Sequence, residues 1–122
     1  AAITQGFARA PRRAAFSIHS FTRQMHQGER RRWDAGFLCR RDMAAAQVFV
    51  DCLSRARPDL VLAINEPYQI EDEGDWFIPH HAEPRGIRHC LIEVCNDQLQ
   101  SDAGVELWAG LLAQAIGEVL SG

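Results

Sequence analysis

A histidine stands where the first β-like run of the chain, residues 14–19, comes to an end. His19 lies within the sequence Ser-Ile-His-Ser-Phe-Thr over residues 17–22. Proteins with an α/β fold place ligands where the chain leaves the sheet. Imidazole is a common metal ligand and also transfers protons near neutral pH. The position predicts a metal ligand or a proton-transfer group, with a purely structural histidine as the alternative.

A glutamate interrupts the third β-like run, residues 89–95, which is otherwise mostly apolar. An ionised carboxylate inside such a strand costs several kcal/mol unless it is paired or bound to a metal. Burial raises the pKa of a carboxylate, which suits a general base. Strand alternation puts Leu91, Glu93 and Cys95 on one face and Ile92 and Val94 on the other, so neither face is plainly polar. Glu93 is therefore a candidate base, with a solvent-exposed side chain as the alternative.

Polar side chains also follow the second β-like run, residues 59–64. The sequence Asn-Glu-Pro-Tyr over 65–68 places amide, carboxylate and phenol groups at the predicted sheet edge that carries His19. Asn and Pro also favour plain turns. The run itself is nearly continuously apolar, which predicts an interior strand covered on both faces.

Two loops contribute further candidate binding residues. Arg30, Arg31 and Arg32 precede Trp33 in the loop 28–36, and guanidinium groups bind carboxylates through paired hydrogen bonds. A basic run beside an aromatic residue also occurs in nucleic-acid-binding proteins. This run is short and the chain has a net charge of −3, so a small carboxylate is favoured over nucleic acid. The loop 66–86 contains the adjacent pair His80 and His81, which could bind a metal ion or a substrate.

The elements that must position these residues alternate between strand and helix. A helix is predicted over 42–57, with Asp42 near its N-terminus and Pro58 after its end. A last helix begins near Ser101 or Asp102, and its apolar stripe consists of Val105, Trp108, Leu112, Ala115, Ile116 and Val119. The alternation predicts a three-layer α/β/α arrangement with a mainly parallel or mixed sheet. Three strands make a small sheet for two covered faces, which indicates part of a larger fold.

Composition limits the class of protein. The 122 residues suffice for one domain, and 47% hydrophobic with 24% charged residues is typical of a globular protein. No signal peptide and no apolar run of about 20 residues is evident, so we expect a cytoplasmic protein without a membrane partner. Four cysteines form no Cys-x-x-Cys pair, and Cys52 and Cys90 lie among apolar residues, as expected of core packing in a reducing compartment.

In their order along the chain, these motifs resemble the N-formylglutamate amidohydrolase family. These enzymes are zinc-dependent hydrolases that release formate or an acyl group from an N-acylated amino acid. The resemblance runs from about residue 16 to residue 120. Its most specific parts are His-Ser-Phe-Thr at 19–22 and Asn-Glu-Pro-Tyr at 65–68. The other matching residues are Arg31-Arg32-Trp33 with Gly36 and Asp42, His81-Ala82 with Arg85-Gly86, and Ile92-Glu93.

The resemblance implies a role for each of six residues. The family is also similar in fold to the zinc carboxypeptidases, which makes His19 a zinc ligand and Glu93 the general base of an amide hydrolase. Arg31, Asn65 and Tyr68 would bind the carboxylate and amide of a small N-acyl amino acid. His81 would contact the substrate or support the site. Zinc of this kind keeps one position open for water and lowers the pKa of that water.

Three positions depart from the family pattern. Arg23 and Arg32 stand where the family usually has Pro, and Cys95 stands where it usually has Arg.

The resemblance also implies that the remaining metal ligands belong to an N-terminal half. Residues 1–122 are accordingly expected to form a single domain, the C-terminal portion of an amidohydrolase-like fold. The alternative is a non-catalytic domain that keeps the fold and binds a small carboxylate.

Overall fold

A computed structural model describes residues 14–24, 28–66 and 87–121. The described chain contains four strands, two α-helices and one 3₁₀ turn. In chain order they are β1 (Ala14–Phe21), β2 (Ala35–Leu38), α2 (Met43–Ala56), β3 (Leu62–Ile64), β4 (Arg88–Cys95), η2 (Asn96–Leu99) and α3 (Asp102–Ser121).

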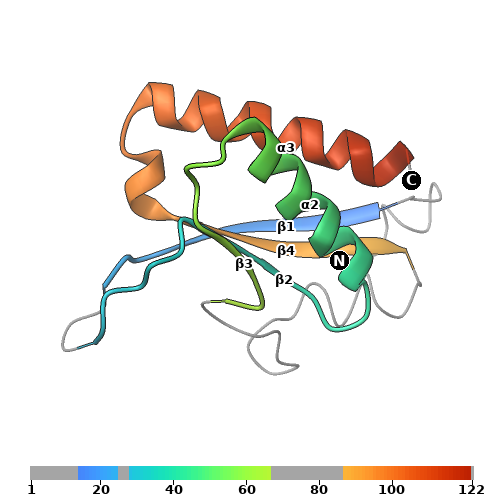
Figure 1. Cartoon of the computed structure of the whole chain (residues 1–122), viewed down its shortest axis with the longest axis horizontal. Helices are drawn as coiled ribbons and strands as arrows, with labels where there is room; N and C mark the ends of the chain where they lie inside the picture. Colours follow the sequence, from blue (N-terminus) through green and yellow to red (C-terminus); the bar gives the residue numbers. More distant parts are fainter. Residues whose placement is uncertain (1–13, 25–27, 67–86, 122) are drawn as a thin grey trace, which may run out of the picture.

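The four strands form one mixed sheet in the order β1-β4-β2-β3 (Figure 1). β1 pairs in parallel with β4, and β2 pairs in parallel with β3. The two parallel pairs meet in an antiparallel contact between β2 and β4. The α/β class and the mixed sheet expected from the sequence are therefore confirmed.

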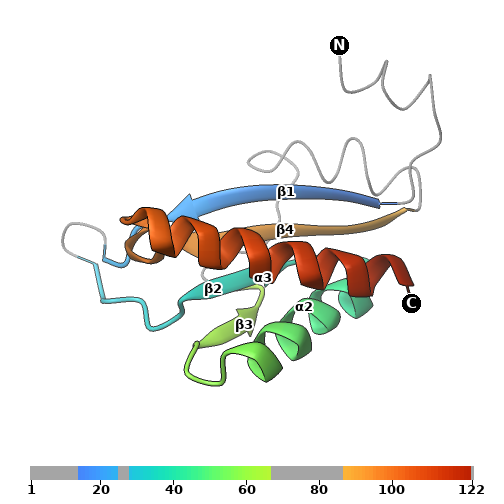
Figure 2. The same cartoon turned by 90° about the horizontal axis from the view of Figure 1, so that it is seen from above.

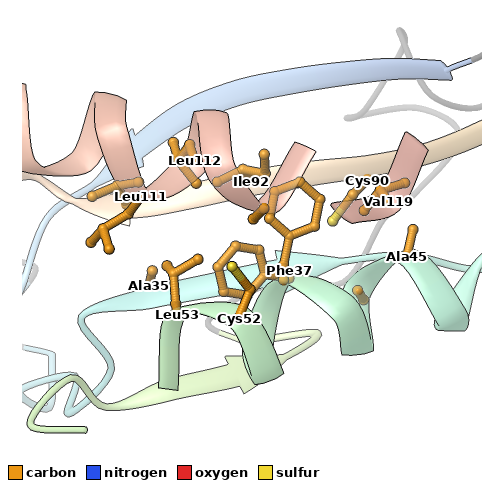
Figure 3. Close-up of a cluster of buried hydrophobic side chains, with 14 of the residues drawn as sticks. Ala35, Phe37, Ala45, Cys52, Leu53, Cys90, Ile92, Leu111, Leu112 and Val119 are labelled. Carbon is orange, nitrogen blue, oxygen red and sulfur yellow. The ribbon is translucent and has the colours of Figure 1, made fainter. Parts of the chain in front are cut away.

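Both α-helices of the described chain lie on the same face of the sheet, as Figures 1 and 2 show. The side chains of β4 alternate between two environments. Cys90, Ile92 and Val94 join the core beneath the helices. Figure 3 shows Leu111 and Leu112 of α3 meeting this part of the sheet. His89, Leu91, Glu93 and Cys95 project from the opposite face, as the alternation of the sequence predicts.

A charged residue fixes the start of α2. The Asp42 side chain accepts a hydrogen bond of 3.0 Å from the backbone N–H of Ala45, which makes it the N-cap. Its other carboxylate oxygen accepts from Arg88 Nε and from the His89 backbone N–H, each at 3.0 Å. Burial raises the pKa of Asp42, but these hydrogen bonds outweigh that effect and hold it below its usual range. Asp42 therefore joins α2 to the start of β4.

The strand assignments need two corrections. Residues 35–38 form β2, whereas 28–36 was expected to be a loop. The strand was not predicted because the glycine in Ala-Gly-Phe-Leu weakens the local strand signal. The run 59–64 yields a strand of three half-buried residues at the edge of the described sheet, so the expected interior strand is wrong. The interior positions belong to β2 and β4.

The last helix begins where expected but buries a slightly different stripe. Trp108, Leu112, Ala115 and Val119 are buried as predicted. Val105 is 49% exposed, and Leu111, which the stripe omitted, is buried in its place. In length and mean hydropathy (1.3) α3 would also suffice to cross a membrane, contrary to the expectation from sequence. Here its buried side chains belong to the core.

Candidate functional site

Two of the six predicted site residues are direct neighbours in the sheet. The register pairs His19 of β1 with Glu93 of β4, and Glu93 in turn with Gly36 of β2. Gly36 pairs with Ala63 of β3, so one row across the sheet reads His, Glu, Gly and Ala. Side chains paired in this way share a face. The imidazole and the carboxylate therefore project from the face opposite the helices, and Gly36 is the neighbour of Glu93 in the next strand.

His19 occupies an exposed position near the carboxyl end of β1. The Ser17 hydroxyl lies 2.9 Å from Nε2 of its ring. Ser17 and His19 are two positions apart and so share a face of the strand. When Nε2 donates to Ser17, Nδ1 is the ring nitrogen that offers a lone pair to a metal ion. The local sequence thus supplies an orienting partner for the imidazole.

Glu93 is only 7% exposed, in contrast to its neighbour His19. Strand β4 lies inside the sheet, between β1 and β2. Gly36 of β2 contributes no side chain next to the carboxylate, and Ala63 of β3 lies one strand further away. A buried carboxylate with small neighbours can contact a bound molecule and accept a proton from it.

Arg31 lies against the end of β1. Its guanidinium carbon is 5.8 Å from the centre of the Phe21 ring, and its NH1 group donates to the Thr22 carbonyl at 3.0 Å. Phe21 follows His19 by two residues on the same face of β1, roughly 7 Å further along the strand. His19 and Glu93 therefore lie near the carboxyl ends of two parallel strands, where α/β proteins bind ligands, and Arg31 lies beyond the end of one of them.

Arg23 organises the segment that carries Arg31. Its guanidinium donates to Asp97 through Nε at 2.8 Å and to Asp34 through NH2 at 2.8 Å. The hydrogen bond from Arg23 holds the pKa of Asp97 below its usual range. The same partnership raises the pKa of Arg23, so the guanidinium stays charged. This ion-pair cluster ties the end of β1 to the start of β2 and to η2.

The other predicted residues are placed differently. Asn65 ends β3 with a positive φ of 59°, and its side-chain oxygen accepts from the Cys39 backbone N–H at 2.9 Å. β3 is separated from β4 by β2, so Asn65 is not brought next to Glu93. Its observed contacts close the end of β3 onto β2. Tyr68 and His81 lie outside the described residues, as does His80.

A zinc ion needs three protein ligands in a catalytic site. Within the described ranges, no group of three or more His, Cys, Asp or Glu side chains could hold a metal ion. The pair of His19 and Glu93 offers one imidazole and one carboxylate on a shared face. These residue types suit a zinc site as two of its members and leave its ligand set incomplete.

Comparison with known proteins adds to this geometry. The family model for N-formylglutamate amidohydrolase matches residues 1–99. The chain belongs to this family. Its structure also resembles the crystal structure of gene product Atu2144 from Agrobacterium tumefaciens, with a TM-score of 0.80 and 26% sequence identity. That likeness covers 98% of this chain and 48% of the other, so the chain spans about half the length of that protein. No curated protein gives a match.

Three further residues contribute to the site beyond the six that were predicted. Ser17 contacts the His19 ring, Gly36 lies beside Glu93, and Arg23 holds the segment that carries Arg31. The two-residue spacing of Ser17 and His19 in one strand was a usable signal. The partners of Arg23 are distant in sequence, at Asp34 and Asp97, so only the folded structure identifies them.

Proposed function

We propose that this chain is the C-terminal portion of a metal-dependent amidohydrolase that cleaves the amide bond of an N-formyl or N-acyl amino acid. The observation that carries the proposal is the register pairing of His19 with Glu93 on one face of the sheet. Membership of the N-formylglutamate amidohydrolase family supports the same reaction class. The substrate is a small molecule resembling N-formylglutamate.

His19 is the proposed zinc ligand in this chain. Its exposure leaves the ring accessible, and the hydroxyl of Ser17 fixes the ring orientation through Nε2. The other zinc ligands come from outside the described residues. When bound, zinc polarises the scissile carbonyl and lowers the pKa of a bound water.

Glu93 is the proposed general base. Its carboxylate accepts a proton from the attacking water and returns that proton to the nitrogen of the leaving amino acid. Burial in the middle of the sheet keeps competing water away from the carboxylate. Gly36, the neighbour of Glu93 in β2, places no side chain against this carboxylate.

Arg31 is the proposed partner of the substrate's carboxylate. A guanidinium binds a carboxylate through two parallel hydrogen bonds. The guanidinium lies over the ring of Phe21. This contact limits the conformational freedom of the Arg31 side chain before the substrate binds. Asn65, Tyr68 and His81 are proposed to bind the rest of the substrate. Neither nucleic acid nor a membrane is a proposed partner, and the proposed location is the cytoplasm.

A non-catalytic carboxylate-binding domain is the second candidate. The observation in its favour is a hollow of about 330 Å³ lined by Glu29, Arg30, Arg31, Arg32 and Trp33. Neither His19 nor Glu93 lines this hollow. Carboxylate binding by the arginines therefore requires no contribution from the proposed catalytic pair.

Replacement of the proposed base separates these two functions. Glu93→Gln keeps the size of the side chain and removes its ability to accept a proton. In the full-length protein, which by this proposal supplies the remaining zinc ligands, we expect the release of glutamate from N-formyl-L-glutamate to fall by at least about 100-fold in kcat, with KM nearly unchanged. Glu106→Gln, an exposed position on α3, is the matched control and should keep the wild-type rate.

Turnover by the Glu93→Gln variant at the wild-type rate would exclude Glu93 as the base. A full-length protein that binds N-formyl-L-glutamate with zinc present but does not hydrolyse it would favour the binding domain.

A further inference from the structure

The guanidinium of Arg23 uses all five of its N–H donors. It makes two hydrogen bonds to Asp97, at 2.8 and 3.0 Å, and one to Asp34 at 2.8 Å. The remaining two go to backbone carbonyls, that of Arg31 at 3.2 Å and that of Trp33 at 2.8 Å. The side chain is only 13% exposed. A side chain so fully engaged has no donor left for a ligand, so any role in binding must pass through its partners.

The two carboxylates that hold Arg23 are themselves fixed to the sheet. The backbone carbonyl of Asp34 accepts from the Cys95 N–H at 2.8 Å, at the end of β4. The side chain of Asp34 accepts from the Val61 N–H at 2.8 Å, just before β3. Asp97 lies in η2, directly after β4. The guanidinium is therefore anchored to three strands at the carboxyl end of β4.

The two carbonyls that Arg23 holds belong to the arginine loop, which we define as residues 28–33. The backbone N–H of Arg31 also donates to the Arg23 carbonyl at 2.7 Å, so the two arginines are joined in both directions. This loop forms the hollow of about 330 Å³ described above. Within it, the guanidinium of Arg32 lies 5.6 Å from the centre of the Trp33 ring. Three arginines line this hollow against one acid, Glu29, and this excess of positive charge suits an anionic ligand.

We propose that Arg23 is a positioning residue that holds the arginine loop in the conformation that binds the substrate's carboxylate. Asp34 and Asp97 fix the guanidinium, and the guanidinium fixes the backbone at Arg31 and Trp33. The identity of the ligand rests on the proposed function, whereas the control of the loop by Arg23 does not.

The planar fork of arginine is essential to this role. A lysine in its place keeps the charge but has three donors on one nitrogen atom, which cannot reach two carboxylates and two carbonyls at once. Arg23→Lys should therefore preserve the fold while releasing the loop. A suitable control is Arg55→Lys, because Arg55 pairs with Glu118 at 2.6 Å between α2 and α3. Both variants replace an ion-paired arginine, and only the first involves the loop.

The test combines a binding measurement with a spectroscopic one on the full chain. In calorimetric titrations with N-formyl-L-glutamate, we expect the Kd of Arg23→Lys to rise about tenfold, a change of about 1.4 kcal/mol. In ¹H–¹⁵N spectra, the amide signals of Arg31 and Trp33 should shift, while those of Leu112 and Val119 in α3 stay in place. Arg55→Lys should leave the Kd and the loop signals unchanged.

Two results would overturn the proposal. The first is loop signals that stay in place in Arg23→Lys. The second is a wild-type Kd in Arg23→Lys when Arg31→Ala weakens binding. If the wild-type chain does not bind N-formyl-L-glutamate, the proposed substrate fails. The loop signals then still decide whether Arg23 controls the loop.

Discussion

The two faces of the sheet both bury apolar side chains, but they differ in the polar groups they carry. On the helix side, the side chains of Phe37, Cys90, Ile92 and Val94 are apolar and at most 1% exposed. On the other side, Leu38, Leu91 and Cys95 are at most 2% exposed, and the imidazole of His19 and the carboxylate of Glu93 lie on the same face. Neighbouring residues of β4 thus belong to a packed core and to a candidate catalytic site.

This difference shows how a rigid core positions a reactive group. Ile92 and Val94 flank Glu93 in sequence and are both buried beneath the helices. Their packing fixes the strand, and the strand fixes the direction of the carboxylate between them. The packed helix face therefore fixes the position of the one carboxylate that β4 carries on its other face.

The largest expected effect is on the helix face. Phe37 is fully buried, and its ring stacks on Phe49 with centroids 5.2 Å apart. Phe37→Ala leaves a cavity that α2 and α3 cannot fill, so we expect the free energy of unfolding to fall by about 3–5 kcal/mol in urea titrations. Glu93→Gln, made on the opposite face, should change it by much less.

The division between the faces would be contradicted if the two variants lost similar stability. In that case Glu93 would be a structural residue of the core, and its burial would carry no argument for catalysis.

A smaller effect is expected from the carboxylates that connect the elements. Hydrogen bonds from Arg23 depress the pKa of Asp97, and those from Ala45, His89 and Arg88 outweigh burial to depress the pKa of Asp42. A depressed pKa in the folded state stabilises the fold above the unfolded pKa of about 3.9, and this stability is lost as the pH falls through the folded value. The free energy of unfolding should therefore decrease as the pH falls below about 4.

The double variant Asp42→Asn/Asp97→Asn should be less stable at pH 7 and should lose less stability on acidification. Phe37→Leu is the control, because it weakens the apolar face at every pH without altering the slope. Urea titrations between pH 3 and pH 7 measure both quantities. An acid slope in the double variant as steep as that of the wild type would show that other groups carry the pH dependence.

The sequence predicts the elements with strong local signals. Asp42 marks the start of α2, and the alternation in β4 correctly separates Glu93 from Ile92 and Val94. The pairing of β1 with β4 could not be predicted, since 66 residues separate Phe21 from Arg88 and register depends on contacts between distant segments. Strand β2 was missed for a local reason, since it is four residues long and contains a glycine that weakens the strand signal.

The candidate site divides in the same way. Residue types and motif order singled out His19, Glu93 and Arg31, and the structure brings these three to one end of the sheet. Asn65 was expected at the same edge, but its observed hydrogen bonds join β3 to β2. Arg23 had no signal in the local sequence, because its role arises from partners at positions 34 and 97.

The central claim, that His19 binds zinc and Glu93 acts as a base beside it, is tested most directly by zinc affinity. Calorimetric titration of zinc into the full-length protein, which by this proposal supplies the remaining ligands, compares a proposed ligand with a proposed base through its wild-type, His19→Ala and Glu93→Gln forms. We expect the Kd for zinc to rise at least about tenfold in His19→Ala and to stay within about threefold of wild type in Glu93→Gln. Wild-type zinc affinity in His19→Ala would contradict the account.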